Sequence, residues 1–149
     1  GLGHEHTGFF NRKYIPTQGD QNLPDAKLTN PNNYRSIRYA DVLLMAAEAY
    51  SAGGIDETKA RLYLNQVIER AFGNTSHNVT VSGPGLTDLI LKERRLELMG
   101  EGHRFFDLVR TGKADGTIPG FIAGRHELFP IPFEEIEFSN GNWAQNIGY

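Results

Sequence analysis

The stretch ERRLELMGEGHRFFDLVR, from Glu93 to Arg110, decides how this chain is interpreted, because it sets four acids and four arginines among large apolar residues. On a helix, charged residues at steps of three or four lie along one stripe; here they are Arg94, Glu97, Glu101, Arg104, Asp107 and Arg110. Leu91, Leu98 and Phe105 recur every seven residues on a neighbouring stripe. We therefore predict one long helix whose charges, Glu93 included, pair between turns as a structural network beside a buried line.

Composition limits the possible classes of protein. The 149 residues are 39% hydrophobic and 22% charged, which describes a soluble globular chain the size of one ordinary domain. The formal net charge of −3 provides no basic surface for nucleic acid, so no nucleic-acid partner is expected. No apolar run approaches the roughly 20 residues that span a bilayer, and the absence of cysteine excludes a disulfide framework and a thiol site.

Apolar periodicity predicts two further helices, over residues 36–52 and 56–72, with Ser36 and Asp56 as N-caps. Gly53-Gly54 and Gly73 are expected to end them. The short connection makes the pair an antiparallel hairpin, whose small and bulky positions resemble one tetratricopeptide (TPR) repeat. The predicted buried positions are Ile37, Ala40, Leu44 and Ala47 in the first helix and Ala60, Leu64, Val67, Ile68 and Ala71 in the second.

The third helix is predicted over residues 87–110, with Thr87 as its cap and a bend or break at Gly100 and Gly102. Residues 128–132, LFPIP, are expected to be extended because proline keeps the preceding residue out of the helical region. One helical turn is expected at residues 134–136. The predicted fold class is therefore mainly α, a TPR-like hairpin plus a long charged helix, with irregular loops and little sheet. Residues 1–35 lack either period, so we expect an irregular segment of a larger parent fold, followed by a helical domain over residues 36–149.

Four ordered motifs resemble the C-terminal part of the SusD/RagB family: RYADVLLMAAEAY at residues 38–50, the charged stretch, LFPIP, and QNIGY at residues 145–149. The resemblance covers roughly residues 34–149. It departs from the family at Ile147, where an Asn-Pro-Gly-Tyr run is usual. It implies a nutrient-binding or glycan-binding lipoprotein exposed on the bacterial outer membrane, with its lipid anchor upstream of this chain and a SusC-like TonB-dependent transporter as partner.

Candidate ligand-binding residues are few. Trp143, between Asn142 and Gln145, and Tyr14, beside Arg12 and Lys13, are the best candidate sugar platforms, although aromatic residues more often supply packing area. The histidines could in principle hold a metal, but their spacing fits no zinc pattern, so neither a metal nor another cofactor is expected; they are His4, His6, His77, His103 and His126.

Three functions remain in competition. The resemblance favours a non-catalytic component that binds an oligosaccharide or another nutrient. The alternative is a TPR-like protein–protein interaction module without glycan binding. A glycoside hydrolase, which would use paired carboxylates, is disfavoured, because each acid of the charged stretch has an arginine nearby that should lower its pKa. The sequence therefore predicts no catalytic residue.

Overall fold

The computed structural model describes residues 11–13 and 33–149. Their regular structure is helical: α1 (Tyr39–Ala52), α2 (Glu57–Phe72), α3 (Pro84–Glu97), α4 (Arg104–Arg110) and α5 (Phe133–Phe138). The described residues contain no strand. The predicted fold class, mainly α with little sheet, is therefore confirmed. None of the helices in this described part is both long and apolar enough to cross a membrane.

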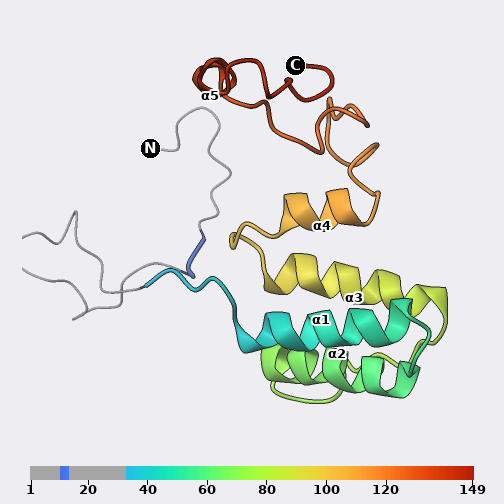
Figure 1. The fold of residues 1–149 in the computed structure, drawn as a ribbon. Coiled ribbons are helices and arrows are strands. Elements are labelled where there is room, and N and C mark those ends of the chain that lie inside the picture. The colour runs from blue at the N-terminus through green and yellow to red at the C-terminus, as the bar shows by residue number, and fades with distance from the viewer. Residues whose placement is uncertain (1–10, 14–32) are drawn as a thin grey trace, which may run out of the picture. The chain divides into compact units, whose positions relative to one another are not determined.

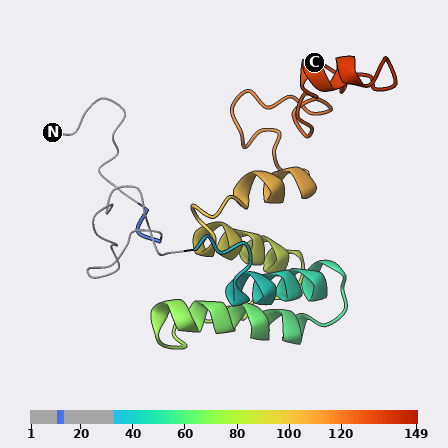
Figure 2. The same ribbon diagram turned by 60° about the vertical axis from the view of Figure 1, so that its left-hand side comes forward.

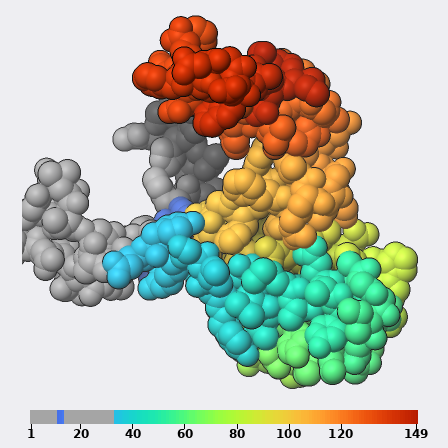
Figure 3. Space-filling view, in the orientation of Figure 1, coloured from blue at the N-terminus to red at the C-terminus, as the bar shows by residue number. Residues whose placement is uncertain are grey.

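Helices α1 and α2 form the predicted antiparallel hairpin (Figure 1). The Asp56 side chain caps α2 by accepting a hydrogen bond of 3.0 Å from the Lys59 backbone N–H. Gly73 ends the helix in the left-handed region, at a φ of 71°, which glycine adopts without steric cost. In the space-filling view the side chains of the two helices form one continuous mass (Figure 3). The Asp56 cap and the Gly73 end of α2 were thus both correctly predicted from sequence.

Helix α3 packs beside α1, so that α1 lies between α2 and α3 in both ribbon views (Figures 1 and 2). Leucine, isoleucine, valine and alanine side chains from the three helices share one core, and five large ones are fully buried. Burying an aliphatic side chain of this size stabilises the fold by about 1.5–3 kcal/mol. The five are Leu44, Leu64, Val67, Leu86 and Ile90.

Four local predictions were wrong. Helix α1 begins after Arg38, whose backbone is extended and whose side chain makes no capping bond, so Ser36 is not the cap and Ile37 is exposed. Ala71 is also exposed, near the end of α2.

Helix α3 begins earlier than expected, at Pro84, because proline has no N–H to satisfy and a φ already suited to the first turn. Thr87 therefore lies inside α3, where its hydroxyl bonds that of Ser51 at 2.8 Å.

The long helix is broken where the glycines predicted a bend or break. Helix α3 ends at Glu97, and Gly100 and Gly102 have φ of 79° and 84°, values that other residues rarely adopt. The chain turns there before α4 begins. Leu98 and Phe105 consequently do not share a helix, so the expected continuous apolar stripe is not formed.

Residues 102–149 form a second compact unit, in which two of the quoted motifs are bonded to each other. The Gln145 side chain accepts a hydrogen bond from the Ile131 N–H and donates one to the Ile131 carbonyl, each 2.8 Å long. The Asn146 amide donates to the Phe129 carbonyl at 2.6 Å. Side-chain amides thus bond a segment whose prolines lack backbone donors. The extended conformation predicted for this segment is present at Pro132, with a ψ of 139°, and α5 follows it.

Candidate functional site

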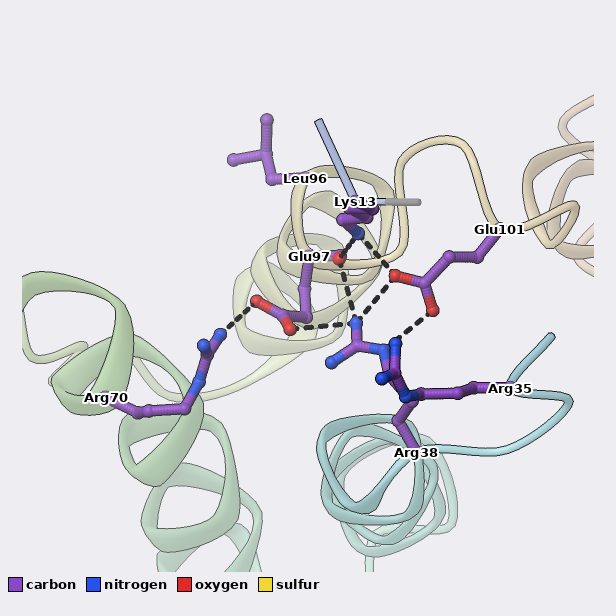
Figure 4. Close-up of a pocket in the computed structure, with 7 residues that line it drawn as sticks. All are labelled: Lys13, Arg35, Arg38, Arg70, Leu96, Glu97 and Glu101. Carbon is purple, nitrogen blue, oxygen red and sulfur yellow. Dashed lines mark hydrogen bonds and ion pairs between the residues drawn. The ribbon is translucent and has the colours of Figure 1, made fainter. Parts of the chain in front are cut away.

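A polar hollow of about 340 Å³ lies in the first unit, at the end of α3 (Figure 4). Its walls come from the segment before α1, from α1's N-cap residue, from α2 and from the end of α3. Six of its seven lining residues are charged. The seven are Lys13, Arg35, Arg38, Arg70, Leu96, Glu97 and Glu101.

Arg38 is the centre of the charged cluster. Its guanidinium forms a bidentate ion pair with Glu101, in which Nε donates to Oε2 and Nη2 donates to Oε1, each at 2.8 Å. The same Nη2 reaches Oε1 of Glu97 at 2.9 Å and the Glu97 carbonyl at 3.1 Å. One arginine therefore holds both acids and also a carbonyl at the C-terminal end of α3, where positive charge is favoured.

Three further residues complete the cluster. Arg70 of α2 pairs with the second carboxylate oxygen of Glu97, and Lys13 bonds both the Glu97 carbonyl and the Glu101 carboxylate. The Tyr34 hydroxyl donates to the Glu101 carbonyl at 3.2 Å. The short described segment around Lys13 is thereby tied to the turn after α3.

Hydrogen bonding keeps Glu101 ionised although it is buried. Burial alone would raise the pKa of Glu101, but the hydrogen bonds from Arg38 and Lys13 outweigh it, and the pKa is lowered. The pKa of Arg38 is raised above its ordinary value, chiefly by its bond to Glu101, against the opposing effect of burial. The pair is therefore charged throughout the physiological pH range.

Glu93 behaves differently from the other acids of this stretch. Partial burial, together with the negative charge of Glu97, raises the pKa of Glu93, while Arg70 and Lys92 only partly oppose the shift. The expectation that a nearby arginine lowers the pKa of each acid is therefore wrong at Glu93.

The remaining predicted charges are distributed over both units. Arg94 points into the core, where Nη1 lies 2.8 Å from Oδ1 of Asp41 on α1. Asp107 and Arg110 pair within α4 at 2.7 Å, at the predicted spacing of three residues. Arg104 is exposed at the start of α4. The bonds described for Arg94, Glu97 and Glu101 thus join different elements instead of successive turns of one helix.

The sequence interpretation missed the partners of these acids and arginines. Arg38 and Asp41 stand three residues apart at the start of an otherwise largely apolar helix, a position that could have marked them as partners of buried charges. Nothing in the local spacing of Lys13 or Arg70 points to residues 97 and 101. These contacts depend on how the three helices pack.

The candidate sugar platforms are not part of this cluster. Trp143 belongs to the second unit, where the residue is 54% exposed and its backbone N–H donates to the Ser139 hydroxyl at 3.1 Å. Tyr14, His4 and His6 lie outside the described residues. Also in the second unit, a hollow of about 350 Å³ is lined mainly by aromatic and apolar side chains, including Phe105, Phe121, Phe129 and Tyr149.

The described histidines make ordinary packing and backbone contacts. The His77 ring stacks on Phe72 with centroids 3.8 Å apart, and Nδ1 of His126 accepts from the Ile122 N–H at 3.0 Å. Across residues 11–13 and 33–149, no three metal-ligating side chains come together. The charged hollow, by contrast, has four cationic side chains in its lining, and such groups form charge-assisted hydrogen bonds with anions.

Comparison with known proteins identifies the family, since residues 2–127 match the SusD family. The chain belongs to that family. Two SusD-like proteins of Formosa agariphila, P38 and P2, are each 34% identical to it and cover 97% and 78% of its length. The chain spans only 34% and 26% of those two relatives.

Solved structures agree with this assignment. A laminarin-binding SusD-like protein is 39% identical over 97% of this chain, with a TM-score of 0.73, and the chain covers 30% of it. A SusD homologue from Bacteroides thetaiotaomicron is 34% identical over 79% of this chain, with a TM-score of 0.70, and the chain covers 26% of it. This SusD-family chain thus corresponds to about a third or less of the relatives it matches.

Proposed function

We propose that this chain is the C-terminal part of a glycan-binding or nutrient-binding lipoprotein on the surface of a bacterial outer membrane. The whole protein captures an oligosaccharide and delivers it to a SusC-like TonB-dependent transporter. The observation that carries this proposal is the similarity to the laminarin-binding structure, which extends over 97% of the chain. The lipid anchor and most of the ligand site belong to a part of the protein upstream of residue 1.

The role proposed is binding without catalysis. Arg38 and Lys13 hold Glu101 as a carboxylate with a lowered pKa, whereas the acid of a glycosidase needs a raised one. Glu97 is held by Arg38 and Arg70. Glu93, whose pKa is raised, is the residue on which a hydrolase would depend. Release of reducing ends from laminarin by this chain, abolished in Glu93→Gln, would contradict the non-catalytic proposal.

Calorimetry with laminarin tests the binding role. We expect the full-length parent protein to bind measurably more tightly than residues 1–149, because a sugar site needs several converging polar groups around its aromatics. Trp143 is the candidate platform within the described part of the chain, so Trp143→Ala is the variant to compare with the unmodified chain. Phe138→Ala, which removes an exposed aromatic side chain from the same unit, is the matched control. Equal affinity of parent and fragment, lost only in Trp143→Ala, would instead place the site within this chain.

An interaction module without glycan binding remains the second candidate. It is favoured by the apolar side chains that α1 leaves exposed in this chain, namely Tyr39, Val42 and Met45. A parent protein that binds its SusC-like transporter but gives no heat with a broad glycan panel would support this alternative over the first.

A further inference from the structure

The charged hollow at the end of α3 has more positive than negative charge. Its lining contains four cationic side chains and only two carboxylates, Glu97 and Glu101, which leaves an excess of two positive charges. Glu93 lies close enough for its pKa to respond to Arg70, but it does not line the hollow. This excess belongs to a chain whose formal net charge is −3, so it is a local feature.

The carboxylates of Glu97 and Glu101 are buried and already form ion pairs with cationic residues. The side chains of Glu101 and Glu97 are only 2% and 9% exposed, and each accepts bonds from two cationic residues. The cationic side chains are more accessible: that of Arg70 is 60% exposed and that of Lys13 is 33% exposed. The surface offered to solvent is therefore mainly made of cationic donors.

Arg35 adds a cationic group with spare donors. It is exposed, it lines the hollow together with Arg38 (Figure 4), and no carboxylate among the described residues lies within ion-pair distance of it. A guanidinium presents five N–H donors in a planar fork that matches the oxygens of carboxylate and sulfate groups. An oxyanion in the hollow would also relieve the repulsion between neighbouring cations.

We propose that this hollow binds a single oxyanion substituent of an acidic glycan, a sulfate ester or a carboxylate, through Arg35, Arg70 and Lys13. The proposal rests on the glycan-binding function proposed above and gives it a ligand class. The volume of about 340 Å³ accommodates one such group together with part of the ring that carries it. Arg38 has a positioning role, because its Nε and Nη2 together hold the carboxylates of both Glu97 and Glu101.

The first test uses small anions and the chain of residues 1–149. Sodium sulfate and sodium glucuronate are titrated separately at constant ionic strength against sodium chloride, and the arginine Nε–H signals are followed by NMR. We expect saturable shifts, and a dissociation constant about threefold to fivefold larger in Arg35→Ala, as for a partly exposed ion pair. The response to sulfate and to glucuronate separately shows which of the two groups is preferred.

Arg95→Ala is the matched control, because it removes an exposed arginine of α3 that does not line the hollow. It should bind both anions as the unmodified chain does. Shifts that rise without saturation, or an equal loss in the two variants, would overturn the proposal.

A second test separates the anion site from the proposed function. Neutral laminarin and its sulfated derivative are compared by calorimetry on the parent protein and its Arg35→Ala variant. The proposal requires that Arg35→Ala weakens binding of the sulfated glycan and leaves that of the neutral one unchanged. If both glycans bind equally in both proteins, the anion site is refuted while the glycan-binding function stands. If neither glycan binds, the proposed function fails, and the ligand class assigned to this hollow fails with it even where free sulfate binds.

Discussion

Arg94 and Asp41 face each other inside the helical core, with Nη1 and Oδ1 2.8 Å apart and both side chains only about one-twentieth exposed. They join α3 to α1. Burying two charges is costly, so such a pair restricts which helix faces can meet more than it adds to stability.

Removing one member of this pair should therefore be strongly destabilising. Asp41→Ala leaves the Arg94 charge buried without this carboxylate, and we expect a loss of about 3–5 kcal/mol in the free energy of unfolding. Denaturant titration measures it. The double variant Asp41→Leu/Arg94→Met should recover most of the loss, because an apolar pair needs no desolvation of charge. A single variant that unfolds at the denaturant concentration of the unmodified chain would contradict this account.

Glu97→Ala and Arg104→Ala should differ in effect, although both residues lie on the same predicted stripe. Glu97 accepts hydrogen bonds from Arg38 and Arg70. Its loss leaves their N–H donors without this acceptor and should lower the free energy of unfolding by about 1–3 kcal/mol. Arg104 is exposed, and its replacement should stay within about 0.5 kcal/mol. Thermal unfolding of the two variants side by side decides the point, and equal shifts would refute the distinction.

Glu101 should make stability fall in acid. Its pKa is lower in the folded chain, so its contribution is fully present above its unfolded pKa of about 4.3 and is lost as the pH falls through the folded value. The difference in unfolding free energy between the unmodified chain and Glu101→Gln should thus be largest near neutral pH and shrink below about pH 4. A difference independent of pH would show that Glu101 is not held as a carboxylate.

The ionised form of Glu93 should lower stability, whereas that of Glu101 raises it. Its pKa is raised in the folded chain, so the ionised form is destabilising above the folded pKa, and the effect vanishes below the unfolded value of about 4.3. Glu93→Gln should therefore be more stable than the unmodified chain near neutral pH and lose this advantage in acid. A lower melting temperature for Glu93→Gln at neutral pH would contradict the prediction.

Gly100 should be needed to keep the segment around Lys13 in place. A Cβ at Gly100 would lie 2.0 Å from Nδ2 of Asn11, whose Oδ1 accepts from the Lys13 N–H, and the φ is also positive. Gly54→Ala is the control, because it has a similar φ and nothing within 4 Å. Both variants should lose about 1–2 kcal/mol to backbone strain, and Gly100→Ala should additionally displace Asn11. NMR signals of Asn11 and Lys13 that change equally in the two variants would refute the contact.

Sequence periodicity predicted the helices well because the buried face of an amphipathic helix recurs every three or four residues. Ala60, Leu64 and Val67 were recognised on that ground, and Gly100 and Gly102 marked the break. The starts of α1 and α3 were harder to place. A hydroxyl residue is only one way to begin a helix, and Pro84 provides another.

The charged cluster could be predicted only in part, because helical spacing relates residues a turn apart. The acids and arginines of the 93–110 stretch were identified, and the Asp107–Arg110 pair has the expected spacing. The partners of Glu101 are 63 and 88 residues away in sequence, at Arg38 and Lys13. The Arg38 pair follows from the packing of α1 against α3 and the Lys13 pair from the position of residues 11–13, and periodicity specifies neither.

The separation of Arg38 and Asp41 from their partners also affects the order of events during synthesis. Asp41 is made 53 residues before Arg94, a delay of roughly 3–10 s at usual translation rates. During that interval a nascent α1–α2 hairpin would carry an acid without its arginine on the face that later becomes core. The hairpin is therefore expected to remain loosely formed on the ribosome until α3 emerges, and the three helices to become stable together in one cooperative step.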